Sequence, residues 1–284
     1  MISVSDAYRY CRRLTHKSGP HFSIGFRFLP APKRRAIYAV YAFCRYADDI
    51  VDEHQDKPLD RLLTLWEEEL DRCYRREPTH PITVALADAI RRYPIPKEGF
   101  LGLIEGCRMD LLYNRYPTFD SLMVYCNRVA TTIRDLSLPV FGYRDPRGVL
   151  YGRALSTALQ LTNIVRDIGE DLSRGRIYLP LDEIKEAGYS EGELVRRVRN
   201  EAFLRLIRFQ CGRIRRYFEE SAKLVPLIDA DARLALLLMR NVYITLLEKI
   251  EARPFDVLDR PIRLSWGERG KVLVAALLRG DRVV

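Results

Sequence analysis

Apolar residues recur at steps of three and four along almost the whole chain, and alternation with a period of two is nearly absent. This spacing predicts helices over 4–17, 58–75, 119–143, 147–172, 190–222, 229–251 and 266–279. Prolines open further helices, one over about 32–54 and one each from Pro81 and Pro96. Residues 175–180 interrupt the pattern and are predicted to form a loop or a short extended piece. Because so many amphipathic helices must each bury a stripe, we expect a single all-α domain over 1–284 with a central cavity.

The composition agrees with a helical globular protein. Of the 284 residues, 48% are hydrophobic and 10% aromatic, which excludes a disordered or collagen-like chain. No apolar run approaches the roughly 18 residues that span a bilayer, and the N-terminus lacks the apolar core of a signal peptide, so we expect a cytoplasmic protein. The six cysteines form no CxxC pair, which predicts reduced, mostly buried thiols. The four histidines lack ligand spacing, and a zinc site is not expected.

The formal charge of +9 has several explanations. Besides a solvated basic surface, they are binding to nucleic acid, to an anionic membrane surface or to a polyanionic small substrate. Nucleic acid is the weakest of them, because no zinc-finger spacing, RNP-like string or continuous basic arm is present and the arginines are interleaved with acids. We therefore expect no nucleic-acid partner.

Two polar stripes interrupt the apolar helical pattern. The first lies in the helix that Pro32 opens and follows i, i+4, i+7, i+11 spacing: Tyr41, Arg45, Asp48 and Asp52. The second follows i, i+3, i+7, i+11 spacing, with Ser156 one turn earlier: Gln160, Asn163, Asp167 and Asp171. Apolar residues flank both stripes, which indicates that the carboxylates face inward.

Inward carboxylates are expensive unless cations accompany them. Mg²⁺ takes oxygen ligands and often completes its shell with substrate phosphates, so two facing aspartate helices predict a clamp for a diphosphate. The alternative is that these acids pair with nearby Arg or Lys on solvated faces. The occurrence of two such stripes, each with uncharged polar residues in register, favours the clamp.

The segments YAFCRYADDIVDE and LTNIVRDIGEDLSRGRIYLP resemble the two aspartate-rich signatures of the squalene/phytoene synthase family. The resemblance extends to HFSIGFRFLPAPKRRAIYAVYAF, CRMDLLYNRYPTFDSLMVYCNRVA and VYITLLEKIEARPFDVLDRPIRLS. It implies an all-α isoprenoid-synthase fold and a prenyltransferase that joins two prenyl diphosphates head to head.

The resemblance also implies roles for individual residues. Mg²⁺ ligands would be Asp48, Asp52, Asn163, Asp167 and Asp171, with Gln160 contacting metal or phosphate. Basic residues that match diphosphate contacts are Arg45, Arg166 and Arg260, and His21 stands where a phosphate-binding flap is often found. Tyrosines that match the cavity lining are Tyr41, Tyr125, Tyr178 and Tyr243, with Tyr125 expected to stabilise a cation or assist proton transfer. Thr131 and Arg134 replace small residues common in the family, which leaves the shape of the pocket open.

The reaction implied by the resemblance is condensation of two farnesyl diphosphates through presqualene diphosphate, towards squalene or hydroxysqualene in bacterial hopanoid biosynthesis. A phytoene or dehydrosqualene synthase of carotenoid biosynthesis is the alternative. A third interpretation is a non-catalytic relative acting as an assembly or membrane scaffold, but such a protein should have lost aspartates, and all four are present. NADPH use stays open, although no glycine-rich nucleotide fingerprint supports it.

The segment 261–284 combines apolar and basic residues in a short amphipathic pattern. Such a helix can lie on an anionic bilayer, which would place the enzyme peripherally on the inner face of the membrane. Alternatively, the same apolar stripe packs on the domain as its last core helix. The sequence leaves both interpretations open.

Overall fold

The computed structural model describes residues 2–18, 23–53, 58–130 and 132–279. This part of the chain is helical throughout and contains no strand, only isolated bridges, so the all-α prediction is confirmed. Its α-helices are α1 (Val4–Ser18), α2 (Ser23–Phe26), α3 (Ala31–Glu53), α4 (Leu59–Tyr74), α5 (Pro81–Ile90), α6 (Lys97–Leu112), α7 (Phe119–Val129), α8 (Leu138–Phe141), α9 (Arg147–Arg166), α10 (Ile168–Ser173), α11 (Leu181–Glu186), α12 (Glu191–Val195), α13 (Glu201–Ala222), α14 (Ala230–Ala252) and α15 (Trp266–Arg279). A π-helical turn, η1 (Thr132–Ser137), and two 3-10 turns, η2 (Val225–Leu227) and η3 (Pro254–Leu258), complete the set.

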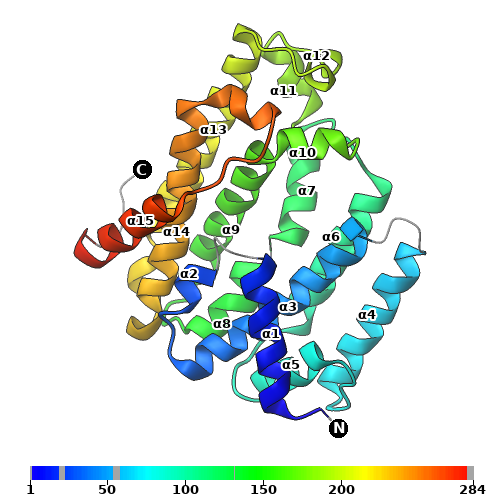
Figure 1. Cartoon of the computed structure of the whole chain (residues 1–284), viewed down its shortest axis with the longest axis vertical. Helices are drawn as coiled ribbons and strands as arrows, with labels where there is room; N and C mark the ends of the chain where they lie inside the picture. Colours follow the sequence, from blue (N-terminus) through cyan, green and yellow to red (C-terminus); the bar gives the residue numbers. More distant parts are fainter. Residues whose placement is uncertain (1, 19–22, 54–57, 131, 280–284) are drawn as a thin grey trace.

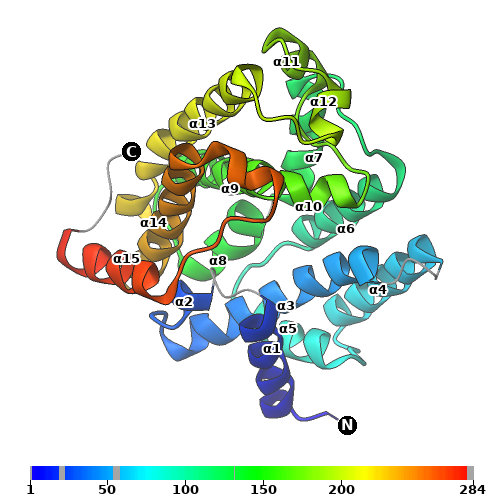
Figure 2. The same ribbon diagram turned by 45° about the horizontal axis from the view of Figure 1, so that its top comes forward.

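The helices form two groups that enclose the centre of the molecule. In one group α3 packs against α1, α4, α5 and α6, and in the other α9 packs against α13 and α14. Both views show the first group in blue and cyan on one side and the second in green to orange on the other (Figure 1, Figure 2). Contacts of α6 with α3 and α7, and of α7 with α9, join the groups. None of the described helices is long and apolar enough to cross a bilayer.

Several helix starts follow the predicted chemistry. Pro81 occupies the first turn of α5, and the preceding His80 accepts a hydrogen bond from the backbone N–H of Ile82. Thr118 and Ser121 form a reciprocal capping box that begins α7. The predicted interruption at 175–180 is confirmed as a loop that carries one bridge, between Arg115 and Ile177.

The predicted helix over 119–143 is wrong in its continuity. α7 ends at Val129, and the π-helical η1 leads into the short α8. Pro139 gives the physical reason, because proline has no N–H for the helical hydrogen bond and its ring crowds the carbonyl four residues earlier. The wider turn brings Ser137 to the wall of the central cavity.

The predicted helix over 147–172 is also broken, between α9 and α10. Asp167 lies at the break with φ −102° and ψ 10°, outside helical geometry. The new direction lets α10 pack against η3, where a Cβ on Gly169 would lie 2.5 Å from the carbonyl oxygen of Leu258. The break thus coincides with a close contact that is distant in sequence.

The predicted helix over 190–222 consists of α12 and α13. The chain turns at Arg197, whose φ is +57°, and Asn200 then begins α13 by accepting a hydrogen bond from the N–H of Phe203. The sequence reading missed this second N-cap, and it also missed the short helices α2 and α11.

All six cysteines are free and buried, as predicted. On α15, Val272 and Ala276 are buried against α14, so the core interpretation is right for this stripe of the C-terminal helix.

Candidate active site

A cavity of about 390 Å³ lies between the two groups of helices. Its walls come from α2, α3, α6, α7, η1, α9, α10 and α14, together with the loop after α10. One part is lined by aspartates, arginines and tyrosines, and another by apolar side chains that include Phe26, Ile37, Val40 and Leu103. The volume lies within the range typical of small-molecule sites.

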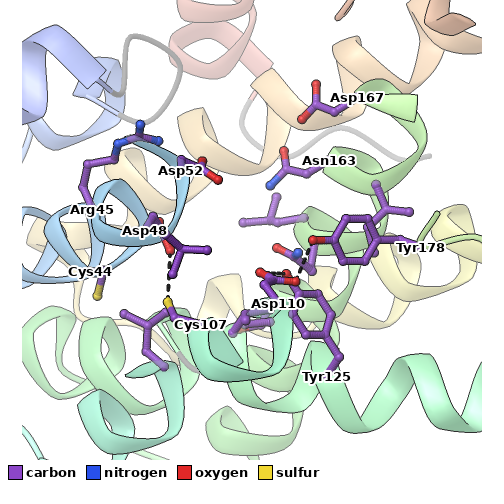
Figure 3. Close-up of a pocket in the computed structure, with 18 of the residues that line it drawn as sticks. Cys44, Arg45, Asp48, Asp52, Cys107, Asp110, Tyr125, Asn163, Asp167 and Tyr178 are labelled. Atoms are coloured by element: carbon purple, nitrogen blue, oxygen red, sulfur yellow. Dashed lines mark hydrogen bonds between the residues drawn. The ribbon is translucent and has the colours of Figure 1, made fainter. Parts of the chain in front are cut away.

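The first polar stripe faces this cavity from α3. Its members are Tyr41, Arg45, Asp48 and Asp52, all of which line the wall. Burial raises the pKa of Asp48 to about 7, and the neighbouring Asp52 contributes in the same direction. The Cys107 thiol of α6 lies 3.6 Å from Asp48 Oδ1 and donates to it (Figure 3). Arg45 pairs with Asp49 one turn on, at 2.5 Å.

The second polar stripe faces the first from α9 and α10. Gln160, Asn163, Asp167 and Asp171 all line the cavity, and Figure 3 shows Asn163 and Asp167 across from Asp48 and Asp52. Burial, and then the charge of Asp167, raise the pKa of Asp171 to about 8.

The members of this second stripe differ in their hydrogen-bond partners. Arg166 donates to both carboxylate oxygens of Asp167, at 2.8 and 2.6 Å. Asn163 hydrogen-bonds the hydroxyl of Tyr243 from α14, which acts to lower the tyrosine pKa although burial raises it overall. The buried Asn163 Oδ1 has no hydrogen-bond partner among the described residues.

Two further arginines, which were not predicted from the sequence, follow the second polar stripe in the chain and pair with Asp52 of the first. Arg174 and Arg176, in the loop after α10, each approach a carboxylate oxygen of Asp52 at 3.4 Å. Both also line the cavity. They stand inside the quoted segment LTNIVRDIGEDLSRGRIYLP, directly after the second aspartate pair, and that position was the available signal.

Asp110 of α6 is a further cavity residue that the sequence reading missed. Its carboxylate accepts hydrogen bonds from the hydroxyls of Tyr125, at 3.0 Å, and Tyr178, at 2.7 Å (Figure 3). The two tyrosine rings stack with centroids 5.2 Å apart. Burial raises the pKa of Asp110, and burial together with the Asp110 charge holds the pKa of Tyr125 well above its ordinary value. The available signal was an acid within the buried run of α6.

Some predicted site residues are not brought to the cavity. Arg260 follows η3, is exposed and is not among the residues that line the cavity, so its prediction as a diphosphate contact is not supported by its position. Arg260 stands in the turn directly after η3, where its side chain is in solvent. Arg134 pairs with Asp135 at 2.5 Å instead of lining the wall. His21 and Thr131 lie outside the described residues.

The donors in the cavity suit a hard cation shared with a ligand. Among the described residues, no three His, Cys, Asp or Glu side chains lie close enough together to hold a metal ion. Asp48 and Asp171 nevertheless carry raised pKa values that an adjacent cation would relieve, and Asn163 Oδ1 offers a neutral oxygen. Mg²⁺ commonly binds one or two carboxylates and takes its other ligands from substrate phosphates and water. The donor set fits that pattern.

Comparison with known proteins gives consistent matches. The family profile described as squalene/phytoene synthase matches residues 15–269. The 15-cis-phytoene synthase of Synechococcus elongatus is 37% identical over 98% of this chain and 95% of that protein. The phytoene synthase of Arthrospira platensis is 36% identical over 97% of this chain and 94% of that protein.

Solved structures show the same fold. A dehydrosqualene synthase in complex with ligand superposes with a TM-score of 0.87 at 27% identity, covering 96% of each chain. The squalene synthase HpnC from Alicyclobacillus acidocaldarius superposes with a TM-score of 0.83 at 32% identity, covering 91% of this chain and 97% of that one.

An all-α isoprenoid-synthase fold, with two aspartate stripes facing each other across a partly apolar cavity, defines a prenyltransferase. The chain belongs to the squalene/phytoene synthase family, whose members join two prenyl diphosphates head to head and depend on Mg²⁺ in general.

Proposed function

We propose that this enzyme condenses two molecules of geranylgeranyl diphosphate to phytoene, in carotenoid biosynthesis. The observation that carries the proposal is the 36–37% identity to cyanobacterial phytoene synthases over nearly the full length of both chains. The corresponding figure for the squalene synthase HpnC is 32% over 91% of this chain. The comparisons therefore support the carotenoid alternative better than the farnesyl and hopanoid interpretation that the sequence first favoured.

Binding of the diphosphates is assigned to the polar part of the cavity. Asp48, Asp52, Asp167 and Asp171, with Asn163, would hold Mg²⁺. Bound there, the metal would act as a Lewis acid that neutralises negative charge on the leaving diphosphate. The arginines that line the same part of the cavity would contact phosphate oxygens directly: Arg45, Arg166, Arg174 and Arg176. Fixed cations act more strongly in such a site once the bound substrates have displaced water.

The tyrosines and apolar side chains of the cavity surround the reacting prenyl chains. Heterolysis of the allylic C–O bond of one substrate releases its diphosphate and leaves an allylic carbocation, which alkylates a double bond of the second prenyl diphosphate. Loss of a proton then closes a cyclopropylcarbinyl diphosphate. Heterolysis of the C–O bond of this intermediate releases the second diphosphate and leaves a second carbocation. Aromatic faces of Tyr41, Tyr125, Tyr178 and Tyr243 can stabilise the cation without capturing it. The apolar walls exclude water that would quench it. Proton loss ends the proposed reaction, so the proposal requires no NADPH.

The test is an incubation of the purified enzyme with Mg²⁺ and either geranylgeranyl or farnesyl diphosphate, with and without NADPH. Mass spectrometry then identifies the hydrocarbons. A forty-carbon hydrocarbon with a central conjugated triene, formed from geranylgeranyl diphosphate independently of NADPH, supports the proposal. Conversion of farnesyl diphosphate alone to presqualene diphosphate, hydroxysqualene or squalene would instead select the second candidate, which the likeness to HpnC supports.

We also propose a cytoplasmic location, which the six buried, unpaired thiols support. Peripheral contact with a membrane would depend on the outward side of α15.

A further inference from the structure

The C-terminal helix α15 carries apolar side chains on two opposite faces. Val272 and Ala276 are buried on the side that packs against α14, at 1% and 4% exposure. The outer face of α15 consists of large apolar side chains that are more than half exposed: Trp266 at 83%, Val274 at 53%, Leu277 at 57% and Leu278 at 78%. With 3.6 residues per turn, Val274, Leu277 and Leu278 project away from the buried pair. Packing on the fold therefore accounts for only half of this helix's apolar surface.

Basic groups surround the outer face of α15. Arg263 and Lys271 are exposed, and the Arg269 guanidinium lies 4.9 Å from the centre of the Trp266 ring. The acidic residue in the first turn, Glu268, pairs with Lys249 of α14 at 2.9 Å. Its charge is thereby neutralised on the inner side, which leaves the outer side cationic.

We propose that the outer face of α15 docks in the plane of an anionic lipid bilayer. Exposed leucine and valine would enter the boundary of the acyl chains, the tryptophan would sit at the headgroup level, and the basic groups would meet lipid phosphates. The charge of this face favours an anionic membrane over a second copy of the same basic chain, because two copies would bring like charges together.

The position of α15 in the fold would bring a bound bilayer close to the cavity. α14 packs against α15 and also contributes Tyr243 to the cavity wall. Figure 1 and Figure 2 both show α15 at the outside of the molecule, beside α14. A bilayer bound there would lie one helix away from a cavity whose prenyl substrates and hydrocarbon product partition into lipid.

The chain contains a spectroscopic probe for this contact. Its two tryptophans are Trp266, on the outer face, and Trp66, which is buried at 4% exposure and stacked on Phe43. Vesicles of phosphatidylcholine with phosphatidylglycerol should shift the emission of Trp266 to shorter wavelength and leave that of Trp66 unchanged. Trp266→Phe should remove the spectral change while the protein still co-sediments with the vesicles.

A matched pair of valine variants separates this helix from the rest of the surface. Val274 and Val195 of α12 are almost equally exposed, at 53% and 55%, so an aspartate at either position should leave the fold intact. Val274→Asp should lower vesicle binding at least about tenfold, because it places an anion in the apolar contact. Val195→Asp should bind as the wild type does. Added salt should weaken binding of the wild type, since screening reduces attraction to the headgroups.

Several results would overturn the proposal. They are an absence of co-sedimentation at low salt, an unshifted Trp266 emission in the vesicle-bound protein, or equal binding by the two valine variants. Equal affinity for vesicles of phosphatidylcholine alone would overturn the choice of an anionic surface. A dimer that shields Trp266 without lipid, and that Val274→Asp dissociates, would assign the face to a second copy.

Discussion

Asp48 should oppose folding while it supports catalysis. Its pKa rises from 3.8 to about 7 because the carboxyl is buried beside Asp52. This difference corresponds to at most about 4 kcal/mol for ionising the group in the folded enzyme. Since the side chain reaches the cavity, water screens part of the effect, and we expect about 1–2 kcal/mol. Asp48→Asn should therefore stabilise the metal-free protein at pH 8 by that amount, which raises Tm by about 2–6 °C.

The pH dependence has a definite sign. A carboxyl whose folded pKa lies above its unfolded pKa destabilises the fold most at pH above the folded value. The advantage of Asp48→Asn should consequently be largest above pH 7 and decline as the pH falls towards 3.8. Asp171→Asn should behave in the same way, with its decline beginning near pH 8.

Thermal unfolding in the presence of a chelator measures the stability of both variants, and product formation at saturating Mg²⁺ measures turnover. Turnover should fall by about 10³ or more, equivalent to roughly 4 kcal/mol of transition-state stabilisation. Asp256→Asn, an exposed aspartate of η3, serves as the control and should change neither quantity. Unchanged stability of Asp48→Asn at pH 8 would refute the inference that the ionised Asp48 carboxylate destabilises the fold. Near-normal turnover would refute its proposed role in holding the metal.

Three further predictions concern other parts of the structure. Asp110→Asn should lower kcat by about 10–100-fold with little change in KM. The two tyrosine hydroxyls bond different oxygens of the carboxylate, and the amide NH2 that replaces one of these oxygens cannot accept a hydrogen bond. An unaltered kcat in steady-state kinetics would contradict a role of this contact in turnover. Glu69→Ala should cost about 2–3 kcal/mol in denaturant unfolding, since this carboxylate accepts bonds from Thr83 and from the backbone N–H groups of Thr79 and His80. Despite burial, these bonds lower the pKa of Glu69 to about 2. The contribution of Glu69 to stability should therefore be complete above pH 4.5 and vanish as the pH falls through 2. A loss of stability in Glu69→Ala that does not change with pH would contradict this. Gly169→Ala should destabilise the folded protein by about 1–3 kcal/mol and reduce turnover, because the new methyl group meets the carbonyl of Leu258 in η3. Unchanged unfolding in calorimetry together with unchanged product formation would contradict this prediction.

The sequence predicts local features of the site better than distant ones. Asp48 and Asp52 belong to one uninterrupted helix, so their spacing alone places them on one face. Asp167 and Asp171 reach the cavity although the helix is broken at Asp167, and beyond this break α10 closely approaches η3. Helical periodicity contains no information about that contact.

Residues brought together from separate segments were the hardest to foresee. Asp110 acquires its environment from Tyr125 and Tyr178, which lie 15 and 68 residues further along the chain. Arg260 shows the converse case, because a motif near the C-terminus suggested a phosphate contact and the fold leaves the side chain exposed, outside the cavity lining. In both cases the outcome depends on how segments distant in sequence pack together, which neither propensity nor spacing determines.

The geometry of α3 suits the proposed binding of both ends of a prenyl diphosphate by one helix. Val40 and Asp52 both line the cavity and lie twelve residues apart on α3. At 1.5 Å per residue, this separation is about 18 Å. The cavity-facing side of α3 thus changes from apolar to acidic along its length, so that a prenyl chain can lie beside the first part while its diphosphate reaches the second. In the proposed function, the distinction between farnesyl and geranylgeranyl substrates would then depend on how far the apolar part extends, whereas Mg²⁺ would bind at the acidic part. Substrate length and Mg²⁺ requirement should therefore vary independently in this enzyme.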